Sequence, residues 1–193
     1  MTLADKFTSV RLILTPVFFV VYFLDRLFPE INARSPVIIA VLWLIFIITE
    51  ISDFFDGFIA RKLGEVSDFG KLYDPFADTL AQLTYFFCFV QDGILLPAFL
   101  FLVILYREFG ILFLRNLFLQ KGISLGARLS GKIKTFIYIV SIGFALITAT
   151  LLRLCPQNPV VPVISVITSG IFILSALISV FSFFDYIYIY KKK

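Results

Sequence analysis

The sequence predicts an all-α fold, a polytopic membrane protein with six transmembrane helices. Of its 193 residues, 60% are hydrophobic, and the mean hydropathy is +1.00. Soluble domains usually contain about 45–50% apolar residues. The apolar residues here gather into six runs, each about long enough to cross a hydrocarbon core of ~30 Å as a helix. One soluble core could not bury six such runs, so we expect a single membrane domain over residues 1–193.

The first half of the chain contains three of the expected spans. Residues 2–9 mix polar and apolar side chains and are expected to form a short interfacial helix. The first two spans are expected at residues 10–28 and 35–54, where long apolar runs occur. The third, at residues 75–91, is the shortest and most polar, and the Asp-Gly pair that ends in Gly93 favours a turn directly after it.

The second half contains the other three spans. The fourth is expected at residues 94–114 and includes Arg107 and Glu108, which must face protein or water rather than lipid. The fifth and sixth are expected at residues 134–153 and 160–183, with a proline-containing turn between them.

The distribution of Lys and Arg predicts the orientation of the chain. With the N-terminus in the cytoplasm, thirteen of the seventeen basic residues fall on the cytoplasmic side, three on the opposite side, and Arg107 within a span. This bias follows the positive-inside rule, so both termini are expected to be cytoplasmic. The loop between the second and third spans is then cytoplasmic as well. Tyr186, Tyr188 and Tyr190 are interpreted as an anchor at the membrane interface.

The composition excludes several function classes. The chain has no His, which removes histidine bases and histidine metal ligands, and its two Cys are too few for a zinc site. It has no basic, aromatic-interleaved patch, so no nucleic-acid partner is expected. Walker A and G-x-G-x-x-G motifs are also missing from the sequence, which argues against a soluble-type nucleotide fold.

An acidic cluster follows the second span, between Ser52 and Asp78, and holds six of the thirteen acidic residues. Asp53 and Asp56 are three apart and Asp74 and Asp78 four apart, so each pair shares a helix face. Antiparallel helices would bring these four carboxylates together, and their repulsion would be relieved by a divalent cation. All-oxygen ligation favours Mg²⁺, Mn²⁺ or Ca²⁺, and two such ions about 4 Å apart are a common device of phosphoryl chemistry. Helix capping and surface pairing account better for the remaining two, Glu65 and Asp68.

The spacing of the cluster carries a family resemblance. The pattern reads Asp53-x2-Asp56-Gly57-x2-Ala60-Arg61-x8-Gly70-x3-Asp74-x3-Asp78. It resembles the signature of the CDP-alcohol phosphotransferase family at every fixed position. The resemblance implies six membrane helices, a homodimer and a polar cavity open to the cytoplasm. Two ions, Mg²⁺ or Mn²⁺, would lie there beside the pyrophosphate of a CDP-linked substrate.

The resemblance also implies a role for each residue of the motif. Asp53, Asp56 and Asp74 would be metal ligands, and Asp78 would contact metal and act as the general base. The residues implied to lie along the nucleotide are Gly57, Ala60, Arg61 and Gly70, the last by permitting close backbone approach.

Three further segments resemble those of bacterial phosphatidylglycerophosphate synthases. They are "TSVRLILTPVF" (8–18), "YREFGILFLRNLFLQKG" (106–122) and "SGKIKTFIY" (130–138). The acceptor would then be sn-glycerol 3-phosphate, whose phosphate requires cationic partners. The candidate acceptor-phosphate residues are Arg107, Arg115, Lys132, Lys134 and Thr135. Two alternatives stay open: that Arg107 only pairs with Glu108 and locks helices, and that the two lysines are ordinary positive-inside charge.

The expected reaction is transfer of the phosphatidyl group from CDP-diacylglycerol to sn-glycerol 3-phosphate, with release of CMP, in a bacterial inner membrane. The main alternative is a transferase of the same family with another acceptor, such as inositol phosphate, phosphatidylglycerol, serine or choline. A more distant alternative is a divalent-cation carrier. A carrier would place its ligands near the membrane midplane, often between repeats, whereas these acids lie at one membrane face.

Overall fold

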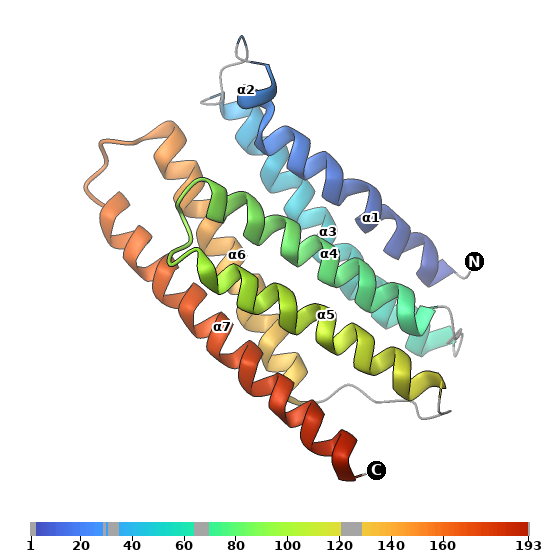
Figure 1. Cartoon of the computed structure of the whole chain (residues 1–193). Helices are drawn as coiled ribbons and strands as arrows, with labels where there is room; N and C mark the ends of the chain where they lie inside the picture. The colour runs from blue at the N-terminus through green and yellow to red at the C-terminus, as the bar shows by residue number, and fades with distance from the viewer. Residues whose placement is uncertain (1–2, 29, 31–34, 64–69, 121–128, 193) are drawn as a thin grey trace. The chain divides into compact units, whose positions relative to one another are not determined.

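The computed structural model describes residues 3–28, 30, 35–63, 70–120 and 129–192, and the regular structure within these ranges is helical (Figure 1). This confirms the predicted all-α fold. The helices are α1 (Leu3–Tyr22), α2 (Leu24–Leu27), α3 (Pro36–Leu63), α4 (Gly70–Gln91), α5 (Phe99–Gln120), α6 (Leu129–Leu154) and α7 (Val161–Lys192).

The long helices are those of a membrane protein. Within the described residues, three stretches are long and apolar enough to cross a bilayer: Pro36–Asp53, Leu129–Leu154 and Val161–Tyr188. The apolar part of α1, Phe7–Tyr22, is shorter. Helices α4 and α5 fall short because acidic or basic side chains interrupt them. Each of the six expected spans overlaps one long helix, but six membrane crossings remain a prediction.

The described residues 3–9 are helical, as expected, but they do not form a helix separate from the first span. From Leu3 onwards the described chain is continuous with α1, which ends at Tyr22 rather than at residue 28. The polar side chains near the start of α1 explain this result. Thr8 and Ser9 bond to side chains of α4, so this turn is held inside the helical unit as part of α1.

The described chain groups into two compact units, of which the first comprises residues 1–88 and 153–155. Helices α1 and α3 pack side by side in it (Figure 1), and α4 joins them through Tyr85. The Tyr85 ring meets Phe18 of α1 edge to face at 4.6 Å, and its hydroxyl lies 2.7 Å from the Thr49 hydroxyl of α3. Phe18 and Tyr85 are fully buried, so this contact is the core that aligns the three helices.

The second unit comprises residues 89–152 and 156–193 and contains α5, α6 and α7. Helices α5 and α7 approach closely where Gly110 faces Phe183, because a Cβ at Gly110 would lie 3.0 Å from a carbon of the Phe183 ring. Helices α6 and α7 are joined by hydrogen-bonded polar side chains, a common means of helix association in membranes. The pairs are Ser130 with Asp185 (2.7 Å), Tyr138 with Ser179 (2.7 Å) and Thr148 with Thr168 (2.8 Å).

The turn predicted after α4 is confirmed, and its geometry shows how the helix ends. Gly93 has a φ of 69°, which a residue without a side chain adopts readily. The Ile94 amide donates to Phe89 O at 2.9 Å and the Gly93 amide to Val90 O at 3.0 Å. This pair of bonds is the Schellman motif, which satisfies the last carbonyls of a helix.

Candidate active site

Arg11 of α1 contacts two of the predicted catalytic carboxylates. Its Nη1 lies 2.9 Å from Asp53 Oδ1 on α3 and also forms an ion pair with Asp78 Oδ1 on α4. The Arg11 side chain is 3% exposed, whereas those of Asp53 and Asp78 are 40% and 35% exposed. The guanidinium is therefore enclosed by protein, while both carboxylates keep surface that a substrate or an ion can reach.

The third described carboxylate of the motif, Asp74, is also held by α1. Thr8 Oγ1 donates to Asp74 Oδ1 at 2.6 Å, and the adjacent Ser9 and Tyr73 hydroxyls are 3.0 Å apart. Thr8 and Arg11 are three residues apart and share a helix face. One face of α1 thus supplies partners to Asp53, Asp74 and Asp78, which come from two different helices.

The donor set suits a hard divalent cation, since it consists of carboxylate oxygens. Asp53 and Asp78 converge on one nitrogen of Arg11. Among the side chains that the structure describes, however, no group of three or more Asp, Glu, His or Cys is close enough to hold one ion. The Asp56 side chain lies outside the described part. The predicted metal site therefore stays a prediction.

The residues predicted to lie along the nucleotide are described only in part. Three of them lie near the C-terminal end of α3: Gly57, Ala60 and Arg61. Their surroundings lie outside what the structure describes. Gly70 is the first residue of α4 and is half-buried. Their contact with a nucleotide remains untested.

The sequence reasoning assigned no role in this site to Thr8, Arg11 or Glu50. Thr8 and Arg11 belong to the segment 8–18, which resembles one in phosphatidylglycerophosphate synthases. They form a polar pair on one face of an otherwise apolar helix, and this pattern could have indicated a role in the site. Glu50 lies one turn before Asp53 on α3 and is half-buried. The charges that act on it are those of Asp53 and Arg11, so it belongs to the same electrostatic cluster.

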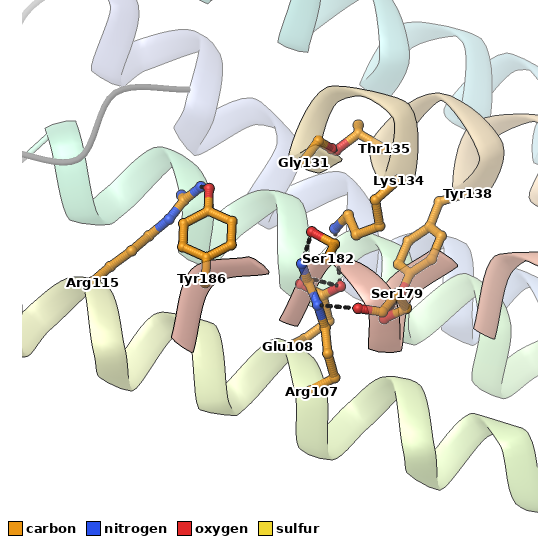
Figure 2. A network of polar contacts seen from close by, with 10 residues as sticks. All are labelled: Arg107, Glu108, Arg115, Gly131, Lys134, Thr135, Tyr138, Ser179, Ser182 and Tyr186. Atoms are coloured by element: carbon orange, nitrogen blue, oxygen red, sulfur yellow. Dashed lines mark hydrogen bonds and ion pairs between the residues drawn. The ribbon is translucent and has the colours of Figure 1, made fainter. Parts of the chain in front are cut away.

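A buried charged network lies in the second unit (Figure 2). Glu108 of α5 accepts hydrogen bonds from Arg107 Nη1 at 2.8 Å and from Lys134 Nζ of α6 at 2.9 Å. The side chain of Arg107 is 5% exposed, that of Glu108 is 4% exposed and that of Lys134 is 8% exposed. Two buried cations therefore share one buried anion. This arrangement shows the Arg107–Glu108 pairing that the sequence left open.

The remaining donors of Arg107 bind α7. Its Nε donates to Ser179 O at 3.1 Å, and its Nη2 donates to Ser182 Oγ at 2.9 Å. Lys134 also lies over the Tyr138 ring, with Nζ 4.4 Å from the ring centroid. Lys134 is thus buried against protein rather than displayed at a span end, and the interpretation as plain positive-inside charge fails for it.

The other predicted acceptor-phosphate residues lie at the ends of α5 and α6. Arg115 Nη2 is 3.4 Å from the Tyr186 hydroxyl of α7 (Figure 2), and Thr135 Oγ1 donates to Gly131 O within α6. Lys132 is exposed. These contacts leave their role toward a phosphate untested.

Tyr186 is 3% exposed, so its interpretation as a membrane-interface anchor is wrong. It supports Arg115 instead, because the guanidinium carbon lies 6.0 Å from its ring centroid. Tyr188, at 66% exposed, is free to meet the interface, whereas the Tyr190 side chain lies outside the described part.

Comparison with known proteins decides the family. A family model described as CDP-alcohol phosphatidyltransferase matches residues 1–181. The chain belongs to this family. It is therefore an enzyme, a transferase, as the aspartate motif predicted.

Several relatives of this CDP-alcohol phosphatidyltransferase are bacterial. A CDP-diacylglycerol–glycerol-3-phosphate 3-phosphatidyltransferase of Treponema pallidum (strain Nichols) is 44% identical over 78% of this chain and 71% of the relative. The protein of the same name from Bacillus subtilis (strain 168) is 35% identical over 75% and 76%. A probable phosphatidylglycerophosphate synthase of Mycobacterium tuberculosis (strain ATCC 25618 / H37Rv) is 33% identical over 73% and 64%.

Proposed function

We propose that this enzyme transfers the phosphatidyl group of CDP-diacylglycerol to sn-glycerol 3-phosphate, giving phosphatidylglycerophosphate and CMP. The observation that carries the proposal is the 44% identity, over 78% of the chain, to a protein named for that reaction. The arrangement of Asp53 and Asp78 around Arg11 supports it, because both carboxylates are partly exposed and come from neighbouring helices.

The proposed metal ligands are Asp53, Asp56, Asp74 and Asp78, which would hold two Mg²⁺ or Mn²⁺ ions. When bound, such ions neutralise the pyrophosphate oxygens and the charge that develops on departing CMP. Without bound ions, Thr8 donates a hydrogen bond to Asp74 and Arg11 donates one to Asp53, and these bonds hold the two carboxylates in place. Gly57, Ala60, Arg61 and Gly70 are proposed to line the nucleotide.

Asp78 is proposed as the general base. Its carboxylate accepts the proton of the 1-hydroxyl of sn-glycerol 3-phosphate while that oxygen bonds to the β-phosphorus of CDP-diacylglycerol. The bond from this phosphorus to CMP breaks, and CMP leaves with the electron pair. Before the ions bind, Arg11 holds Asp78 in place, because its guanidinium is buried and bonded to Asp53 as well.

The acceptor phosphate is proposed to bind in the second unit. Lys132 is exposed there, and Arg115 and Thr135 lie at the same ends of α5 and α6. Lys134 would contribute a buried positive charge, since Glu108 must neutralise both Lys134 and Arg107. Arg107 would act mainly by holding Glu108 and α7, because Ser179 and Ser182 take its other donors.

The proposal includes a homodimer in the bacterial inner membrane with six spans and both termini in the cytoplasm. The strong excess of basic residues on one side of the expected spans supports this topology. The diacylglycerol chains of the donor would then stay in the bilayer while its pyrophosphate reaches the cytoplasmic carboxylates.

The substitution Asp78→Asn tests the assignment of the base. We expect CMP release from CDP-diacylglycerol and sn-glycerol 3-phosphate to fall by about 10²–10⁴-fold, the usual contribution of a positioned base. The unfolding temperature in detergent should stay close to that of the wild type. Asp25→Asn, at α2 in the same unit, is the matched control and should keep full activity. Undiminished turnover in Asp78→Asn would refute this role for Asp78.

A further inference from the structure

Glu50 is a carboxylate that lies beside the site but is not part of the aspartate motif. It is three residues before Asp53 on α3, so the two acids share the helix face that Arg11 contacts. Its chain neighbour Thr49 bonds to Tyr85 of α4, which places this turn of α3 inside the unit. Among the described residues, Glu50 has no hydrogen bond or ion pair of its own, although it is half-buried. A carboxylate in such a position is costly unless a nearby charge compensates it.

Arg11 is the nearby cation, and it is also bonded to the two proposed metal ligands. A divalent cation on Asp53 and Asp78 would be repelled by a guanidinium on the same oxygens, strongly so where protein excludes water. With its three carboxylates ionised, the cluster of Glu50, Asp53, Asp78 and Arg11 carries a formal charge of −3 + 1 = −2. One of the two proposed divalent cations would balance the charge of this part of the site, whereas the same part without Glu50 would carry only −1.

We propose that Glu50 is a positioning residue that takes the Arg11 guanidinium when Asp53 and Asp78 bind a divalent cation. Glu50 thereby lets the ion and Arg11 occupy the same cluster without competing for the same oxygens. The inference rests on the proposed metal site and adds to it a residue outside the motif. It concerns metal affinity, so it can be tested without turnover.

The test is calorimetric titration of the purified full-length protein in detergent with Mn²⁺. Glu50→Gln should weaken Mn²⁺ binding by roughly 5-fold or more, the usual lower limit for coupling between two sites. Asp25→Asn removes the same charge at α2 and should leave the affinity unchanged. Glu50→Asp keeps the charge but shortens the reach toward Arg11, so it should also weaken binding. In an Arg11→Gln background the effect of Glu50→Gln should shrink to less than about twofold, because residues that act through one another are not additive.

The outcomes are distinguishable. Equal Mn²⁺ affinity in the wild type and Glu50→Gln would overturn the inference and leave the proposed function standing. Wild-type affinity in Glu50→Asp would show that charge alone matters and would overturn the positioning role. Failure of the wild type to bind Mn²⁺ would overturn the proposed metal site, and the inference with it. If Arg11→Gln does not fold, the comparison of Glu50→Gln, Glu50→Asp and Asp25→Asn still decides.

Discussion

Arg11 and Glu108 occupy comparable positions in the two units. Arg11 is a buried cation that contacts two carboxylates, and Glu108 is a buried anion that contacts two cations. In each case, removing the central charge leaves two like charges close together. Such a loss costs more than the pair itself contributes, because the remaining charges are left uncompensated.

Glu108→Gln should therefore destabilise the protein strongly. Arg107 and Lys134 would be left buried without their shared anion, and we expect the free energy of unfolding to fall by about 3–5 kcal/mol. Denaturant or thermal unfolding in detergent measures this change. Glu30→Gln alters an exposed acid and is the control. A change in Glu108→Gln no larger than in this control would show that the network does not stabilise the fold.

Lys132→Gln should act on binding instead. Lys132 is exposed, so its removal should leave the unfolding temperature unchanged. Loss of one hydrogen bond to a charged phosphate costs about 1.5–3 kcal/mol, so the KM for sn-glycerol 3-phosphate should rise roughly tenfold or more. Steady-state kinetics measures this KM. Arg26→Gln, which removes a basic residue in the first unit, is the control and should leave the KM unchanged. An unaltered KM would remove Lys132 from the proposed acceptor site.

At the scale of elements, α6 and α7 are held in one antiparallel register. The hydrogen-bonded pairs Tyr138–Ser179 and Thr148–Thr168 fix this register. Counting inward from these pairs, we expect Ser141 and Ser175 at the same level of the two helices. Both serines are fully buried.

A cysteine pair can test this register. We expect Ser141→Cys with Ser175→Cys, in a Cys155→Ser background, to form a disulfide under mild oxidation, detected as a shift on non-reducing gels. Ser141→Cys with Leu177→Cys is the control, because Leu177 is 63% exposed and lies on another face of α7. Cross-linking of the control pair in preference to the Ser175 pair would contradict the register.

The sequence predicted the helices well because apolar runs and turn residues are local signals. The turn at Gly93 and the helix carrying Asp53 are examples. Contacts made across the fold were less predictable. The Arg11–Asp53 pair joins residues 42 positions apart, and its existence depends on how α1 packs against α3. Tyr186 was misjudged because its place near the basic end of the chain resembled an interface, although its spacing from Ser179 and Ser182 puts it on the buried face of α7.

At the scale of the whole molecule, the proposed topology places the turn between α6 and α7 outside the cytoplasm. Cys155 lies in this turn and is an exposed free thiol, whereas Cys88 is a buried one. We expect a membrane-impermeant maleimide to label Cys155 in intact spheroplasts without permeabilisation, and Cys155→Ser to abolish the labelling. Labelling that requires permeabilised membranes would contradict the orientation.

The central claim is the reaction itself, and CMP release tests it most directly. Purified enzyme in detergent would receive CDP-diacylglycerol, Mg²⁺ or Mn²⁺, and one acceptor at a time: glycerol 3-phosphate, inositol 1-phosphate, serine or phosphatidylglycerol. We predict metal-dependent CMP release with glycerol 3-phosphate alone. Release with a different acceptor would contradict the assigned substrate and the roles of Arg115, Lys132, Lys134 and Thr135, and release with none would contradict the proposed reaction.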